Sequence, residues 1–124
     1  MKQLSCVFFV AISFAALVCA ASTVSAQDFM KDMQQAARGM GYANGVYRSH
    51  KCKAFEIPAL NLQHDIMEYY SFTSDDLEGK TEIGKSVNKG RAAAARDARY
   101  PREFCDRMEE VLGLWRSEVL PSPR

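Results

Sequence analysis

Apolar residues recur along most of this chain with the period of an α-helix. Over residues 28–49 they are spaced alternately four and three apart, which is the stripe of an amphipathic helix. The stripe consists of Phe29, Met33, Ala36, Met40, Ala43 and Tyr47, followed by His50. Similar stripes predict helices over residues 59–70, 81–98 and 101–120, with a short helical turn that ends at Glu78. No alternating strand pattern of useful length occurs, so we expect an all-α fold.

Residue types at the ends of these segments support the predicted boundaries. Pro58 suits the first position of a helix, and Thr73 with Asp76 has the spacing of a capping box. Tyr100 precedes Pro101 and is therefore disfavoured in the helical conformation. The side chains expected to face the core are Leu62, Ile66 and either Tyr69 or Tyr70 in the second helix, Ile83, Val87, Gly90, Ala94 and Ala98 in the next, and Phe104, Met108, Val111, Leu112, Trp115 and Val119 in the last.

A row of small residues follows the first predicted helix at every fourth position: Ala37, Gly41, Gly45 and Ser49. Each glycine weakens an isolated helix by roughly 1 kcal/mol relative to alanine. We therefore expect the row to let another helix approach closely, either from the same chain or from a second copy. The alternative is a hinge, or a ligand that lies on bare backbone.

The first 26 residues have the pattern of a secretory signal peptide. Lys2 precedes an apolar run over residues 6–21 that only Ser13 interrupts, and small residues then lead to Ala26. The run is shorter than the ~20 apolar residues of a transmembrane helix and no charged stop follows it. We expect cleavage after Ala26, with cleavage after Ala20 as the alternative, and no stable membrane anchor afterwards.

Removal of 26 of the 124 residues leaves 98, which suits one helical domain over residues 27–124 with an ordered core at about 28–120. Removing Lys2 from the 16 basic residues leaves 15, against 15 acidic residues. This balance argues against a general nucleic-acid binder, which would be basic overall.

Two cysteines remain after such cleavage. Cys6 and Cys19 belong to the signal segment, and Val18 stands where a lipidated cysteine needs a small residue before it. In an exported protein, Cys52 and Cys105 are most simply one disulfide. The chain-entropy estimate for a loop of this length is roughly 4 kcal/mol. We expect the disulfide to cross-link a bundle of four main helices and a short helical turn, in the periplasm.

No arrangement of residues predicts catalysis or a resident cofactor. The spacing of His50, Cys52 and His64 matches no standard zinc framework. The acidic pairs have no partner that would make a hydrolytic site, and there is no G-x-S-x-G elbow or phosphate loop. We therefore expect neither an enzyme nor a dedicated metal site. Copper(I) bound by thioether sulfurs is the one alternative, and its candidate ligands are Met30, Met33 and Met40.

Charge is distributed in blocks. Acidic residues dominate positions 75–82 and 103–110, and basic residues dominate the stretch between them. The bland interpretation is a solvated helix face neutralised by its neighbours. The functional interpretation is a docking strip for an acidic protein, a polyanion or a membrane surface, with Tyr69, Tyr70 and Tyr100 as candidate aromatic contacts. The strip consists of Lys85, Lys89, Arg91, Arg96, Arg99 and Arg102.

Several features recur together in a loose class of small exported helical proteins from alphaproteobacteria, most of which have no assigned activity, and this chain resembles that class. They are a glycine-bearing helix that ends at Cys52, the turn over residues 72–77, an alanine-rich helix centred on Gly90, and Phe104 with Cys105 opening the last helix. The resemblance implies the fold and the compartment, and no catalytic residues. A fainter architectural likeness is to the Hde-type periplasmic acid-stress chaperones.

Together these observations predict an exported, non-enzymatic binding or interaction protein, chaperone-like or envelope-associated. Its expected partner is a periplasmic or envelope protein or a polyanion. The alternative is a carrier of a small ligand or of a metal such as copper.

Overall fold

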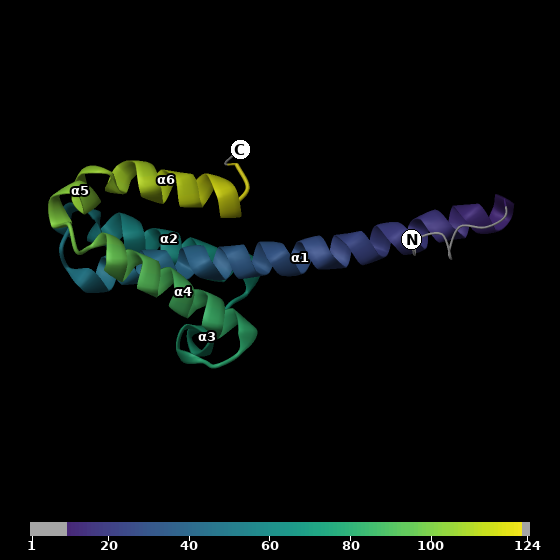
Figure 1. The fold of residues 1–124 in the computed structure, drawn as a ribbon, viewed down its shortest axis with the longest axis horizontal. Helices are drawn as coiled ribbons and strands as arrows, with labels where there is room; N and C mark the ends of the chain where they lie inside the picture. The colour runs from purple at the N-terminus through teal and green to yellow at the C-terminus, as the bar shows by residue number, and fades with distance from the viewer. Residues whose placement is uncertain (1–9, 123–124) are drawn as a thin grey trace. The chain divides into compact units, whose positions relative to one another are not determined.

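The computed structural model describes residues 10–122, with side chains from residue 27 onward. Every regular element among these residues is helical, which confirms the all-α prediction (Figure 1). The elements are α1 (Val10–Ser49), the 3₁₀ helix η2 (Lys53–Phe55), α2 (Glu56–Tyr70), α3 (Ser74–Glu78), α4 (Glu82–Asp97), α5 (Pro101–Asp106) and α6 (Met108–Val119). The four long helices and the short α3 correspond to the predicted bundle.

The predicted signal segment lies largely outside this description. Residues 1–9 fall outside the described residues, and so do the side chains of residues 10–26, which include Cys19. The backbone of residues 10–26 forms the start of α1. Among the described residues, no helix combines the length and the apolar character needed to cross a membrane.

The chain divides into two compact units, Met1–Asp32 and Met33–Arg124. The helical bundle is the second unit. Phe29, the first residue of the apolar stripe, belongs to the first unit and is 58% exposed. Met33 is the first residue of that stripe that packs against the core.

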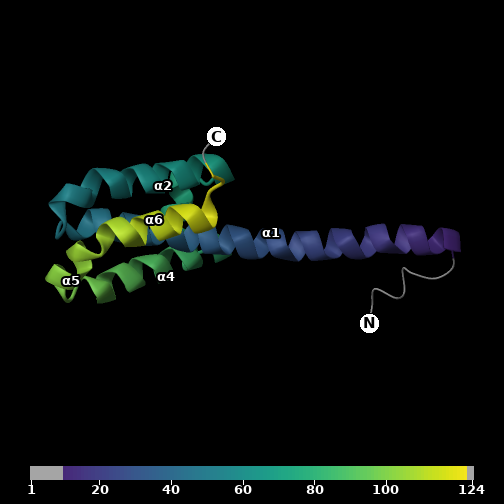
Figure 2. The ribbon, with the colours of Figure 1, turned by 90° about the horizontal axis from the view of Figure 1, so that it is seen from above.

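Within the bundle, residues 33–49 of α1 are contacted by α2, α4 and α6 (Figures 1 and 2). Helix α2 also packs against α6, and α3 packs against α4. Most of the predicted inward-facing residues are buried, and Tyr70 rather than Tyr69 is the partly buried tyrosine of α2. The largest fully buried side chains are Met40, Val46, Leu62, Ile66, Val87 and Met108.

Several predicted helix ends agree with the structure. Helix α1 ends at Ser49 as expected, although it begins at Val10 because the apolar N-terminal segment continues the helix. Thr81 precedes α4, and its hydroxyl accepts a hydrogen bond from the Gly84 N–H at 3.1 Å. The predicted capping box of α3 is present, with the Thr73 N–H donating to Asp76 Oδ2 at 2.8 Å.

Two boundaries differ from the prediction. Helix α2 begins at Glu56, so Pro58 is its third residue and not its first. Proline is tolerated there because the first N–H groups of a helix have no partner within it. The expected last helix over residues 101–120 is two helices, separated at Arg107. No glycine or proline marks this break, which lies two residues after the cross-linked Cys105.

Gly41 and Gly45 of the small-residue row pack against α4 of the same chain. A Cβ atom added to Gly41 would overlap the backbone carbonyl of Val87, and one added to Gly45 would lie 2.7 Å from the Cβ of Ala94. The crossing is reciprocal, since a Cβ added to Gly90 would overlap the Arg38 carbonyl. Glycine is needed on both helices because the two backbones themselves are in contact.

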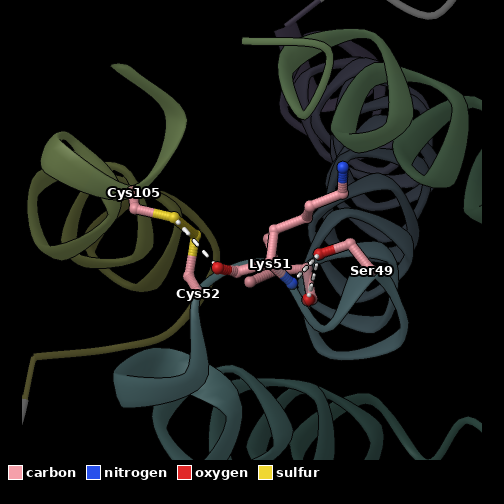
Figure 3. The surroundings of a disulfide bond; sticks show 5 residues. Ser49, Lys51, Cys52 and Cys105 are labelled. Carbon is pink, nitrogen blue, oxygen red and sulfur yellow. Dashed lines mark hydrogen bonds between the residues drawn. A yellow bond between two sulfur atoms is a disulfide. The ribbon is translucent and has the colours of Figure 1, made fainter. Parts of the chain in front are cut away.

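Cys52 and Cys105 form the predicted disulfide, with Cα atoms 5.4 Å apart (Figure 3). Cys52 follows the end of α1, and Cys105 lies in α5. The Sγ atom of Cys105 is 3.5 Å from the backbone carbonyl oxygen of Lys51. The disulfide therefore links the end of α1 to the segment that follows α4.

Candidate functional site

The predicted basic strip does not form a single surface. Successive residues of an α-helix are about 100° apart, so Lys85, Lys89 and Arg96 project from one face of α4. Arg91 projects from a different face and its side chain is only 20% exposed. The strip therefore consists of exposed cations and of Arg91, whose side chain is mostly buried.

Arg91 is held by three polar groups. Its Nε donates to Asn44 Oδ1 at 2.8 Å, and its two terminal nitrogens donate to Asn88 at 3.3 Å and to Glu78 at 3.5 Å. Asn44 is buried, and its Nδ2 donates to the buried Gln63 Oε1 at 2.9 Å. These bonds join α1, α2, α3 and α4. Arg91 is thus a structural residue and does not belong to the candidate docking surface.

The remaining cations of the strip are exposed. Lys85 forms a weak surface pair with Glu82 at 3.5 Å. Lys89 projects from the same face of α4, without an ion pair among the described residues. Three arginines lie where α4 ends and α5 begins, and none of them has an ion pair within the described part of the chain. We call Arg96, Arg99 and Arg102 the basic corner.

A cleft of about 400 Å³ adjoins the basic corner, and Arg96 belongs to both. The cleft lies among residues of α1, α4, α5 and α6. Phe104 is buried, Val111 is partly buried, and the neighbouring Tyr100 is 67% exposed. The residues that line the cleft are Tyr42, Arg96, Asp97, Tyr100, Glu103, Phe104, Arg107 and Val111.

Tyr42 is the buried polar group of this cleft. Its hydroxyl donates to Asp97 Oδ2 at 2.8 Å. Burial raises the pKa of Tyr42 well above the ordinary tyrosine value of 10.0, and the hydrogen bond and negative charge of Asp97 act in the same direction, while Arg107 opposes them. Tyr42 therefore keeps its proton, and its role is to fix Asp97 rather than to act as a base or nucleophile.

The residues considered as metal ligands do not converge. His50 Nδ1 lies 3.0 Å from Glu56 Oε2, His64 is exposed, and Cys52 is oxidised. Among the described residues, no three side chains of His, Cys, Asp or Glu are close enough together to hold a metal ion. The three methionines have different surroundings, since Met40 is fully buried in the core, Met33 packs against it and Met30 is 49% exposed.

The predicted aromatic contacts also separate. Tyr69 and Tyr70 pack edge to face on each other, with ring centroids 4.9 Å apart. Tyr69 lines a different, smaller hollow with Arg116 and Leu120. Of the three tyrosines, only Tyr100 adjoins the basic corner.

Sequence reasoning missed most of the cleft. Glu103, Arg107 and Val111 recur at every fourth position, which places them on one side of a helix. Because Val111 was expected to face the core while Glu103 and Arg107 are charged, the row was not recognised as the lining of one cleft. Tyr42 lies between two core positions of α1 and gave no separate signal. Its partner Asp97 is 55 positions away in the sequence.

Comparisons with family models, with curated proteins and with solved structures each gave no match to this chain.

Proposed function

We propose that this protein is an exported, non-enzymatic interaction protein that docks an acidic partner at its basic corner. The observation that carries the proposal is the cluster of Arg96, Arg99 and Arg102, which are exposed and have no ion pair among the described residues. A local concentration of positive charge on a nearly neutral chain steers an acidic partner to one place.

Two further observations support this proposal. The disulfide between Cys52 and Cys105 is the type of cross-link that persists in oxidising compartments, which agrees with an exported protein of the cell envelope. The exposed ring of Tyr100 lies beside the arginines, and tyrosine and arginine are both enriched in protein interfaces.

Capture of partners from the envelope fraction of the source cells tests the proposal. The disulfide-bonded protein serves as bait beside the variant R96E/R99E/R102E. We expect the wild type to retain a partner with an acidic surface and the variant to lose it, with the interaction weakening as salt is raised.

The matched control is K31E/K53E/K80E, which makes the same change in net charge. These three lysines are exposed and have no ion pair among the described residues. The control should keep the partner. Equal loss in both variants, or equal retention, would contradict a role for the basic corner.

Native mass spectrometry of the protein as isolated should show the mass of the chain alone, and a stoichiometric small molecule would instead favour a carrier.

A further inference from the structure

The cleft beside the basic corner has the size of a receptor for one side chain. Its volume is about 400 Å³, near the lower end of the ~300–1,000 Å³ of small-molecule sites. Its inner part contains the buried rings of Phe104 and Tyr42 and the partly buried Val111. An apolar group inserted there would be removed from water on several sides.

Tyr100 extends this apolar surface to the outside. Its ring is 67% exposed, and it has no ring contact with any described residue. The other exposed tyrosine, Tyr69, packs on its neighbour Tyr70. A large exposed ring at the edge of a cleft provides contact area for a partner at a low cost in conformational entropy.

The charges around the cleft indicate the charge of the ligand that would carry this apolar group. Asp97 accepts the Tyr42 hydroxyl, and Arg107 pairs with Glu110 at 3.5 Å. Of the four charged residues in the lining, Arg96 and Glu103 have no partner within the described part of the chain. Arg99 and Arg102 are not in the lining, but they add exposed positive charge at the junction of α4 and α5 next to Arg96, which favours an acidic ligand.

We propose that the cleft binds one apolar side chain of an acidic peptide segment, whose carboxylates contact the basic corner. The proposal rests on the proposed function and specifies the chemistry of its partner. A polyanion without apolar groups would use the arginines but would leave the rings of Tyr100 and Phe104 unused.

A set of labelled peptides tests this proposal. Each is a glutamate- and serine-rich segment whose central residue is varied over all residue types, and binding is measured by fluorescence anisotropy. For the wild type, we expect peptides with a central Phe, Leu or Trp to bind at least about tenfold more tightly than the peptide with a central Ser, because burial of one such side chain is worth that factor or more.

Two variants locate this preference in the cleft. Tyr100→Ala removes an exposed ring, and Val111→Trp fills the cleft from its partly buried side. Both should remove most of the preference for an apolar central residue, so that the affinities for the Phe peptide and the Ser peptide become similar. Glu103→Gln removes the one unpaired carboxylate of the lining and should strengthen binding of every peptide in the set. Since Tyr100 is exposed, its variant remains informative if Val111→Trp is poorly folded.

The outcomes separate the two proposals. Equal binding of all peptides, weakened by R96E/R99E/R102E, would overturn the cleft proposal and leave the basic corner as a purely electrostatic site. Binding of polyphosphate in preference to any peptide would overturn it in favour of a polyanion. If no peptide binds while the envelope capture still depends on the three arginines, the acidic partner does not use the cleft.

Discussion

Helix α1 is packed in two different ways on its two sides. Toward α4 the contact is made by backbone, since Gly41 and Gly90 each face a carbonyl of the other helix. Toward α2 and α6 the contact is made by side chains, such as the Trp115 ring 6.0 Å from that of Tyr42. Side chains can change rotamer to absorb a change in shape, whereas a hydrogen-bonded backbone cannot. The two sides should therefore respond differently to the same small substitution.

The α4 side also contributes less apolar volume. Val87 is the one large residue of α4 that is fully buried, and the apolar contact with α1 is otherwise made by small residues such as Gly90 and Ala94. The α2 and α6 side supplies Leu62, Ile66 and Met108. Stability on the α4 side must then depend more on how the chain is held at its ends. The disulfide lies at one of these ends, between Cys52 and the helix that follows α4.

The largest expected effect is loss of this cross-link. The double variant Cys52→Ala/Cys105→Ala should lose roughly 4 kcal/mol of unfolding free energy, because the unfolded chain gains the entropy of an open loop with a sequence separation of 53. Urea unfolding of the variant and of reduced wild type measures this loss. The double variant and the reduced wild type should lose the same unfolding free energy. A loss below about 1 kcal/mol would show that the α4 side is held without the disulfide.

The second-largest loss of unfolding free energy is expected when a methyl group is added at the backbone crossing between α1 and α4. Gly90→Ala should lose about 3 kcal/mol, because the new Cβ overlaps the Arg38 carbonyl and no rotamer change can relieve it. Gly39→Ala is the matched control on the other side of α1. There the new Cβ lies 2.8 Å from Cε3 of the Trp115 ring, and the ring can shift. Similar losses for the two variants in urea unfolding would remove the distinction between the two sides.

Much of this architecture was predictable from the sequence, and the reason is local chemistry. The period of apolar residues located the four long helices, and the capping box of Thr73 and Asp76 concerns groups within a turn of each other. The Gly41 and Gly45 row predicted a close helix, because the spacing of small residues on one helix is visible without its partner. The partner itself, α4, was not identified.

The candidate site was less predictable because it depends on contacts between distant positions. Arg91 was grouped with exposed arginines, and its bonds to Asn44, 47 positions away, and to Glu78 show that it is structural. Arg107, which separates α5 from α6, lines the cleft, and no glycine or proline marks this break. The exposure of Phe29 depends on where the packed unit begins, and a continuous apolar stripe carries no sign of that point.

A smaller effect is expected at the hydrogen bond that links α1 to the end of α4. Tyr42→Phe should lose about 1 kcal/mol near neutral pH, the usual net value of one hydrogen bond. Because the folded-state pKa of Tyr42 is raised, its contribution is complete below pH 10.0 and is lost as the pH rises through the folded-state value. Unfolding curves of both proteins should therefore converge above pH 10.0, and a constant difference across this range would contradict the assignment.

The smallest expected effect is a gain. Gly113 lies in α6, and a Cβ added there would meet no atom within 4 Å apart from the atoms of its own helix turn. Gly113→Ala should raise the unfolding free energy by about 0.5 kcal/mol, since alanine restricts the unfolded chain and favours the helix. The substitution is chemically identical to Gly90→Ala, so opposite signs for the two in the same urea titration would isolate the contribution of the backbone crossing. A loss at Gly113 would mean that intrinsic helix preference does not govern the open face of α6, and the cost at Gly90 could then not be assigned to the crossing alone.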